Sequence, residues 1–207
     1  TEPLIIETFR QTLKKYKPDL VLTREQEISL LGPTLHESLE KYLDPEDAKT
    51  AFDDYRKLNI ELHPAMIKTM PHAKELLEEL KVQGYPMAVV SSKKKEAVKL
   101  GLELTQLDSY FLTIVGYDEV KKFKPDPDGY LNACKVLNMY HDDAIYVGDT
   151  DTDMIAADKA GMFSVALITH EERKEALLNA KPNAAIHDLM ELVPILGKNI
   201  SWTRSTT

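Results

Sequence analysis

The stretch Ala144-Ile145-Tyr146-Val147-Gly148-Asp149-Thr150-Asp151-Thr152-Asp153 decides the fold class of this 207-residue chain. A short apolar run ends in a glycine, and three aspartates then follow at alternate positions. An unbroken apolar run of this length is typical of a strand buried on both faces of a parallel sheet. Carboxylates crowded at the end of a strand repel one another, which indicates a compensating cation. The alternative is a polar turn in which the aspartates cap the start of a helix.

The same alternation of apolar runs and amphipathic helices continues on both sides of that stretch. Further strands are predicted at 87–90, 112–115 and 163–167, with a weaker one at 184–186. Helices are predicted from Ala73 to a stop at Gly84, at about 93–103, 127–138 and 150–160, and finally up to Leu196. This order predicts a doubly wound, Rossmann-like α/β fold with a parallel sheet between helices. Its strand carboxyl ends share one edge, where such folds bind their ligands.

Residues 1–62 show helical periodicity and no strand pattern. Three helix-start signals occur there, two capping boxes and one proline-containing first turn: Thr23 with Gln26, Thr34 with Glu37, and Asp44-Pro45. We therefore expect three regions along the chain. These are a small helical domain at 1–62, an α/β core at 63–198 and a C-terminal tail at 199–207.

The composition excludes several classes of protein. The 34 acidic residues outnumber the 26 basic residues, and the net charge of −8 argues against a nucleic-acid surface, which needs a clustered basic face. The single cysteine, Cys134, excludes an internal disulfide framework and a site made of several thiolates. No apolar run approaches the roughly 20 residues of a membrane span, and the first residues do not resemble a signal peptide. We expect a cytoplasmic monomer or weak homodimer without membrane or nucleic-acid partners.

Two further stretches at strand ends carry groups suited to an anion. In Val89-Val90-Ser91-Ser92-Lys93-Lys94-Lys95, a strand passes directly into a helix start, whose free backbone N–H groups attract a phosphate. Taken alone, this stretch reads more simply as a capping serine and a solvated basic turn. In Lys122-Phe123-Lys124-Pro125-Asp126-Pro127, two prolines stiffen the backbone and fix the approach of Lys124 to a phosphoryl group. The alternative is an ordinary proline-rich turn with exposed lysines.

In this order, the three stretches resemble the motifs of the haloacid dehalogenase superfamily of phosphatases, over residues 64–196. Ser91 matches the second-motif hydroxyl that hydrogen-bonds the transferring phosphoryl group. Lys124 matches the third-motif lysine that stabilises the nucleophile and the phosphoryl charge. The pattern Gly-Asp-x-x-x-Asp is the fourth motif, so the resemblance implies that Asp149 binds Mg²⁺ and that Asp153 orients the metal shell.

The helical region resembles the family's four-helix cap, in its pyrophosphatase and phosphoglycolate phosphatase branch. The resemblance implies that Thr34 and His36 face the substrate, together with Ser92 of the core. His36 reads equally as an exposed helical histidine. Sugar-phosphate mutases of the family place an arginine where this chain has Leu35, and this difference argues against the alternative that the chain is such a mutase.

The family's first motif, Asp-x-Asp-Gly-Thr, does not occur in the 207 residues. It supplies the nucleophilic aspartate, and its strand lies between those that end before Ser91 and Asp149. We therefore expect about 15–20 further residues ahead of Thr1, the length of one strand with its loop. This expectation predicts that the strands at 87–90 and 144–147 do not pair with each other.

The resemblance implies a Mg²⁺-dependent hydrolase that removes phosphate from a small phosphorylated molecule through an aspartyl-phosphate. Phosphomonoesters and pyrophosphate both remain open as substrates. A chain without a nucleophile would instead be a phosphate-binding pseudophosphatase. A receiver domain that is phosphorylated on aspartate is a further alternative, against which the helical cap and the Lys-Pro-Asp-Pro stretch argue.

Overall fold

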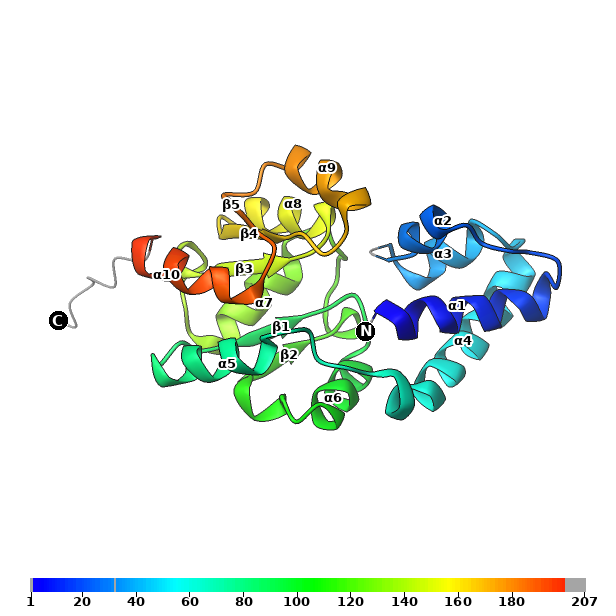
Figure 1. The fold of residues 1–207 in the computed structure, drawn as a ribbon, viewed down its shortest axis with the longest axis horizontal. Coiled ribbons are helices and arrows are strands. Elements are labelled where there is room, and N and C mark those ends of the chain that lie inside the picture. The colour runs from blue at the N-terminus through cyan, green and yellow to red at the C-terminus, as the bar shows by residue number, and fades with distance from the viewer. Residues whose placement is uncertain (1, 32, 200–207) are drawn as a thin grey trace. The chain divides into compact units, whose positions relative to one another are not determined.

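The computed structural model describes residues 2–31 and 33–199, which form two compact units (Figure 1). We call them the helical unit, Thr1–Thr69 with Glu96–Asp108, and the sheet unit, Met70–Lys95 with Ser109–Thr207. The helical unit thus includes Glu96–Asp108, a segment that the expected division near residue 62 assigned to the α/β core. Of the expected C-terminal tail, residues 200–207 lie outside the described residues.

The helical unit begins with four helices, and the predicted start signals are confirmed. They are α1 (Glu2–Tyr16), α2 (Arg24–Ser29), α3 (Leu35–Glu40) and α4 (Pro45–Met66), and most of α6 (Lys95–Leu104) also belongs to this unit. Thr23 and Thr34 each form a complete capping box, and the Asp44 side chain caps α4. A buried apolar cluster that includes Phe9, Leu13 and Leu39 holds the helices together.

Helix α4 extends beyond the expected boundary and contains Pro64 in its last turns. Proline removes one backbone donor, but the N–H of Ile67 donates to the carbonyl of His63 at 3.0 Å and closes the helix. The ring of His63 is fully buried, and its Nδ1 lies 2.6 Å from the carbonyl oxygen of Asn59. Tertiary burial therefore carries the helix through a proline that the sequence pattern reads as a stop.

The sheet unit contains five strands among the described residues, each at a predicted apolar run. They are β1 (Ala88–Val90), β2 (Thr113–Val115), β3 (Ile145–Gly148), β4 (Phe163–Leu167) and β5 (Ala184–Ile186). All pairings are parallel, which confirms the α/β class. They form two sheets rather than one, in the orders β1-β2 and β3-β4-β5. As expected, β1 and β3 are not hydrogen-bonded to each other within the described residues.

Helices cover these sheets and connect their strands (Figure 1). They are α5 (Ala73–Val82), α7 (Asp128–Leu137), α8 (Asp151–Lys159), α9 (Glu171–Asn179) and α10 (Val193–Asn199), with short 3₁₀ turns at Asp108–Tyr110, Tyr117–Glu119, His141–Asp143 and Leu189–Leu192. Helix α9 was not predicted, because Leu177 is the buried residue of an otherwise mostly charged segment. None of the helices in the described part of the chain is long and apolar enough to cross a membrane.

One apolar core fixes the second sheet against the helices at its side. Leu76 and Leu80 of α5 pack with Val165 of β4, Ile186 of β5 and Leu192. Burying one such side chain stabilises the fold by roughly 1.5–3 kcal/mol. Strands β3 and β4 are therefore held firmly, and the polar loop after β3 begins from a rigid base.

An exposed pair of side chains joins the start of α5 to the 3₁₀ turn before α10. Nδ1 of His72 lies 2.6 Å from Oδ2 of Asp188. The hydrogen bond to Asp188 raises the pKa of His72, and the backbone N–H of Met190 together with His72 lowers the pKa of Asp188. The contribution of His72 to stability is therefore complete below its ordinary pKa and is lost as pH rises through its higher folded-state pKa.

We expect Asp188→Asn to move the pKa of His72 down toward its ordinary value, because the substitution removes the negative partner. Titration of the His72 imidazole by NMR in both proteins measures this change. An unchanged midpoint for His72 would show that the pair does not form in solution.

Candidate active site

The loop after β3 places Asp153 through a capping box at the start of α8. Thr150 is the N-cap residue: its hydroxyl accepts from the N–H of Asp153 at 3.0 Å, and its own N–H donates to Oδ2 of Asp153 at 3.1 Å. A Cβ at Gly148 would lie 2.6 Å from the Cβ of Asp153, so only glycine fits at the strand end. The alternative that these aspartates cap a helix is correct for Asp153. The capping box uses Oδ2 of this residue, so Oδ1 can bind other partners.

Lys124 binds that second oxygen. Its ammonium donates to Oδ1 of Asp153 at 2.6 Å, and the two side chains are only 17% and 4% exposed. Burial opposes the charged forms, but the nearby Tyr146 and Asp153 outweigh it for Lys124, so the pKa of Lys124 is raised. Burial likewise opposes the charge on Asp153, but the attraction of Lys124 and the hydrogen bonds lower its pKa. The result is a charged, buried ion pair at neutral pH.

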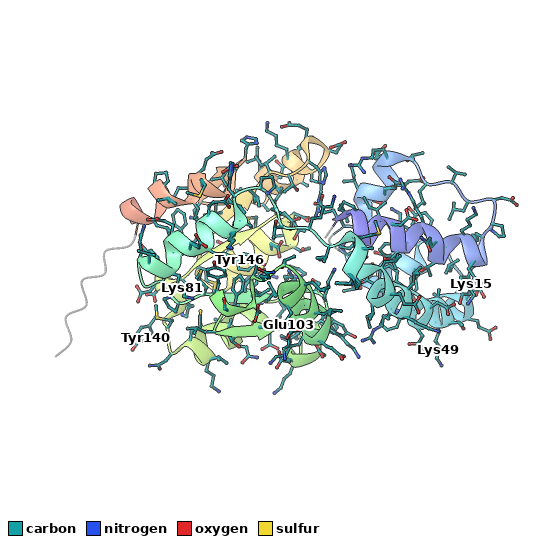
Figure 2. The ribbon with its side chains drawn as sticks, turned by 60° about the horizontal axis from the view of Figure 1, so that its bottom comes forward. Lys15, Lys49, Lys81, Glu103, Tyr140 and Tyr146 are labelled. Atoms are coloured by element: carbon teal, nitrogen blue, oxygen red, sulfur yellow. The ribbon has the colours of Figure 1, made fainter. Side chains whose placement is uncertain are left out.

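Two tyrosines donate to the same carboxylate oxygen. The hydroxyl of Tyr130, from α7, lies 3.1 Å from Oδ1 of Asp153, and that of Tyr146, from β3, lies 3.3 Å from it. The two rings pack with their centroids 4.2 Å apart. Figure 2 shows Tyr146 among the strands of the sheet unit. The sequence analysis counted Tyr146 as part of an apolar run. A tyrosine in a buried strand needs a polar partner for its hydroxyl, and this requirement could have indicated its contact with a carboxylate.

The loop that carries Lys124 is anchored on both sides. At its start, Oδ2 of Asp128 accepts from the backbone N–H of Lys121 at 2.7 Å. Near its end, the ammonium of Lys159, from α8, donates to the carbonyl of Pro125 at 3.1 Å. The loop that carries the lysine is therefore held by hydrogen bonds at both ends.

Ser91 follows β1 directly, close to the same cluster. Its hydroxyl oxygen accepts from the N–H of Lys93 at 3.1 Å, which leaves the hydroxyl hydrogen to be donated. The hydroxyl of Tyr146 lies 3.5 Å from the carbonyl oxygen of Val90. The end of β1 therefore adjoins the Asp153 cluster, and the structure brings Ser91, Lys124 and Asp153 into one region of the sheet unit.

The side chains that follow Ser91 differ in their exposure to solvent and in their partners. Ser92 is exposed. The ammonium of Lys93 is buried and has no hydrogen-bond partner among the described residues. Lys95 is paired with Glu119 at 2.8 Å and is about half exposed. Sequence reasoning treated the three lysines as one basic run and did not single out Lys93.

Asp149 is the first carboxylate after β3, and it is partly buried. Its charge contributes to the raised pKa of Lys124, which places it near the ion pair. No group of three or more His, Cys, Asp or Glu side chains is arranged as a metal site within residues 2–31 and 33–199. Mg²⁺ commonly uses only one or two protein carboxylates beside water and phosphate oxygens, so Asp149 fits as one such ligand.

Thr34 and His36 belong to the helical unit. The Thr34 hydroxyl caps α3, accepting from the N–H of Glu37 and donating to Oε2 of Glu37 at 2.7 Å. Nε2 of the exposed His36 lies 3.2 Å from Oε1 of Glu40. Both side chains have local structural partners, so their roles toward a substrate stay predictions.

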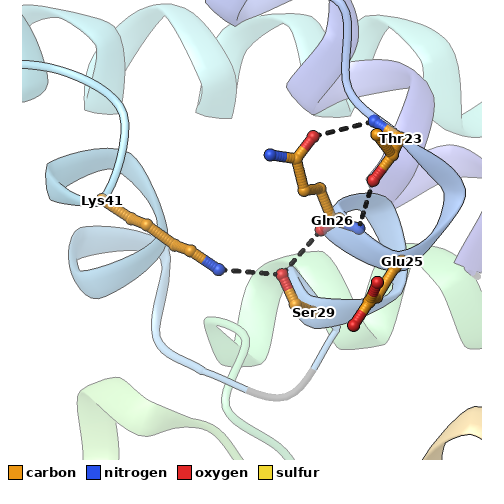
Figure 3. Close-up of a pocket in the computed structure, with 5 residues that line it drawn as sticks. All are labelled: Thr23, Glu25, Gln26, Ser29 and Lys41. Atoms are coloured by element: carbon orange, nitrogen blue, oxygen red, sulfur yellow. Dashed lines mark hydrogen bonds between the residues drawn. The ribbon is translucent and has the colours of Figure 1, made fainter.

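A separate open pocket in the helical unit is lined by the polar residues Thr23, Glu25, Gln26, Ser29 and Lys41 (Figure 3). Its groups largely satisfy one another: Lys41 donates to the hydroxyl of Ser29 at 3.0 Å, and that hydroxyl donates to the carbonyl of Gln26 at 2.7 Å. This pocket therefore has fewer polar groups available to bind a ligand than the cluster at the strand ends.

Comparison with known proteins agrees with this geometry. A family model described as haloacid dehalogenase-like hydrolase matches residues 1–167. Pyrophosphatase PpaX of Bacillus cereus (strain Q1) is 31% identical over 196 residues, which cover 95% of this chain and 90% of that protein. A haloacid dehalogenase-like family hydrolase of Streptococcus pneumoniae superimposes with a TM-score of 0.83 at 22% identity, covering 93% of this chain and 90% of the other.

A structure titled as a predicted phosphoglycolate phosphatase from Haemophilus somnus 129PT also has a TM-score of 0.83. Its identity is 23%, and the match covers 94% of this chain and 91% of that chain. At such identities, both solved structures show that the fold is shared.

Proposed function

Because the chain belongs to the haloacid dehalogenase-like hydrolase family, we propose that it hydrolyses a phosphoester or phosphoanhydride bond in a small phosphorylated substrate. The observation that carries this proposal is the buried Lys124–Asp153 pair, which Tyr146 links to the end of β1 just before Ser91. A fixed cation next to a hydroxyl donor suits a phosphoryl group, whose negative charge spreads over three oxygens during transfer.

We assign the phosphoryl group to Ser91 and Lys124. The Ser91 hydroxyl already accepts the N–H of Lys93, so its hydrogen is oriented away from that bond and is available to a phosphoryl oxygen. Lys124 donates from the braced loop, and Asp153 holds the ammonium in place. Asp153 is in this assignment a positioning residue, because Lys124, two tyrosines and the N–H of Thr150 already bind its oxygens.

Asp149 is the chain's proposed ligand for Mg²⁺. When bound, this ion supplies a Lewis acid that offsets negative charge on the phosphoryl oxygens. No nucleophile is assigned among Ser91, Lys124, Asp149 and Asp153. For this reason, activity is to be measured on the full-length native gene product.

Inorganic pyrophosphate is the proposed first substrate to test, since the relative with 31% identity is named a pyrophosphatase. The helical unit is the proposed cap, with Thr34, His36 and Ser92 as candidate substrate contacts. A cytoplasmic location and a monomeric or weakly dimeric state stay predictions.

Phosphate release tests the proposal directly. Purified full-length protein with Mg²⁺ is expected to release phosphate from pyrophosphate or from at least one small phosphomonoester with saturation kinetics. Absence of turnover on the whole panel, together with retained phosphate binding, would favour the alternative of a non-catalytic phosphate-binding protein.

We expect Lys124→Ala to lower kcat by roughly ten- to a hundredfold, because a charge-assisted hydrogen bond is worth about 1.5–3 kcal/mol. Steady-state kinetics with the best substrate measures the change, after circular dichroism has confirmed that the variant is folded. Lys95→Ala is the matched control, since that lysine is already paired with Glu119, and it should change kcat less than threefold or so. Equal effects at both positions would contradict the assignment of Lys124.

A further inference from the structure

Helix α6 begins after two residues whose side chains cannot cap it. The helix starts at Lys95, and the residues before it are Lys93 and Lys94. A lysine side chain donates hydrogen bonds but accepts none, so it cannot bind a free backbone N–H of the first helical turn. Its positive charge is also unfavourable at the positive end of the helix macrodipole. The start of α6 is therefore stabilised only if another part of the chain provides an acceptor.

Asp118 provides this acceptor from the 3₁₀ turn that follows β2. Its Oδ1 accepts from the backbone N–H of Lys95 at 2.9 Å. The negative charge of the carboxylate is favourable at this end of the helix. In the same turn, Tyr117 donates its N–H to the carbonyl of Lys93 at 3.0 Å. Two hydrogen bonds therefore join the turn after β1 to the turn after β2.

The close approach of these two turns depends on Gly116, the residue directly after β2. A Cβ at this position would lie 2.3 Å from the backbone nitrogen of Lys95 and 2.5 Å from Oδ1 of Asp118. The contacts all lie between β1 and its pairing partner β2. They are therefore on the side of β1 opposite to the edge that has no strand partner among the described residues.

The turn that Asp118 holds is the turn that orients the Ser91 hydroxyl. The backbone N–H of Lys93 donates to Oγ of Ser91 at 3.1 Å, and the N–H of Ser91 donates to the carbonyl of Val115 at 3.0 Å. Because Tyr117 binds the carbonyl of Lys93 and Asp118 binds the next turn of backbone, the N–H of Lys93 stays directed at Ser91. Loss of the Asp118 carboxylate would release the start of α6, and the Ser91 hydroxyl would lose its fixed orientation.

We propose that Asp118 is a positioning residue, which orients the Ser91 hydroxyl toward the phosphoryl group by capping α6. This inference rests on the proposed function, in which Ser91 contacts that group. The Asp118 carboxylate itself touches neither the substrate nor the metal ion. The ammonium of Lys95 has no part in this role, because the cap uses the backbone N–H, and the exposed pair of that ammonium with Glu119 contributes little in water.

Steady-state kinetics of the full-length protein tests the cap. We expect Asp118→Ala to lower kcat/KM by roughly three- to thirtyfold, the range that the loss of a helix cap allows. Asp118→Asn should keep kcat/KM within about twofold of the wild type, because asparagine caps a helix as well as aspartate does. Asp142→Ala, in the 3₁₀ turn before β3, is the matched control and should leave kcat/KM unchanged. An unchanged kcat/KM in Asp118→Ala, or an equal loss in the alanine and asparagine variants, would overturn the proposal.

A double-mutant cycle separates the orientation of Ser91 from a general loss of stability. In a Ser91→Ala background, the hydroxyl that Asp118 orients is absent, so Asp118→Ala should lower kcat/KM by less than about twofold further. A substitution that only loosened the fold would lower kcat/KM by the same factor in both backgrounds. Equal factors would therefore contradict the positioning role.

Binding of inorganic phosphate keeps the test independent of turnover. By calorimetry with Mg²⁺, phosphate should bind the wild type and Asp118→Asn alike, and both at least about threefold more tightly than Asp118→Ala. If this order is found but no substrate is hydrolysed, the proposed function fails and the positioning role of Asp118 stands. If all three proteins bind phosphate equally, or none of them binds it, the positioning role fails.

Discussion

Asp153→Asn is expected to lower the free energy of unfolding by about 3–5 kcal/mol, the usual cost of breaking a buried ion pair by removing one partner. Asparagine keeps the size of the side chain but leaves the Lys124 ammonium buried without a counter-charge. It also weakens the charge-assisted cap at Thr150. Urea denaturation of the two proteins measures the difference.

A double-mutant cycle separates the charge from the shape in this prediction. Lys124→Met combined with Asp153→Asn removes both charges, so the double variant should be less destabilised than the sum of the two single variants. A loss below about 1 kcal/mol for Asp153→Asn alone would mean that the pair is solvated and contributes as a surface pair does.

The second large effect is expected at Asp149. Asp149→Asn should lower kcat on the order of a thousandfold, because a metal ion contributes several kcal/mol to a transition state and each 1.36 kcal/mol is tenfold in rate. The fold should be retained, since the apolar core of β3 and β4 is untouched. Phosphate release at saturating Mg²⁺, with circular dichroism as the check on folding, measures this.

Asp151→Asn is the matched control for Asp149, since it makes the same chemical change two residues away in the first turn of α8. It should alter kcat by only a few fold. Addition of EDTA to the wild type should abolish turnover, and Mg²⁺ should restore it. Full activity in excess chelator would contradict the role of Asp149 as a metal ligand.

Much of the fold was predictable because its signals are local. Apolar runs predicted each strand found within residues 2–31 and 33–199, and the capping boxes at Thr23 and Thr34 predicted two helix starts. The gap between β1 and β3 was expected from the motif pattern, whereas the pairing partner of each other strand was not predicted, because strand pairing depends on contacts between distant segments. Helix α9 was missed because its residues are mostly charged and give little periodicity.

At the candidate site, the order of the strand-end stretches and their resemblance to the family's motifs indicated that Lys124 and Asp153 belong together, and their ion pair is present. The sequence could not distinguish Lys93 from its two lysine neighbours, since only tertiary packing makes one of them buried. The hydroxyls of Tyr130 and Tyr146 were missed for a related reason. An aromatic residue in an apolar run looks the same whether or not its hydroxyl meets a carboxylate.

The convergence of Lys124, Tyr130 and Tyr146 on a single oxygen of Asp153 has a consequence for how this protein can change over generations. Replacing any one of the four residues leaves a buried polar group without its hydrogen-bond partner. Single substitutions therefore lower stability, even where a different set of four residues would serve equally well. A lineage can leave this arrangement only through coordinated replacements. Variation is therefore expected to accumulate on exposed helix faces, while these four positions drift little or drift together.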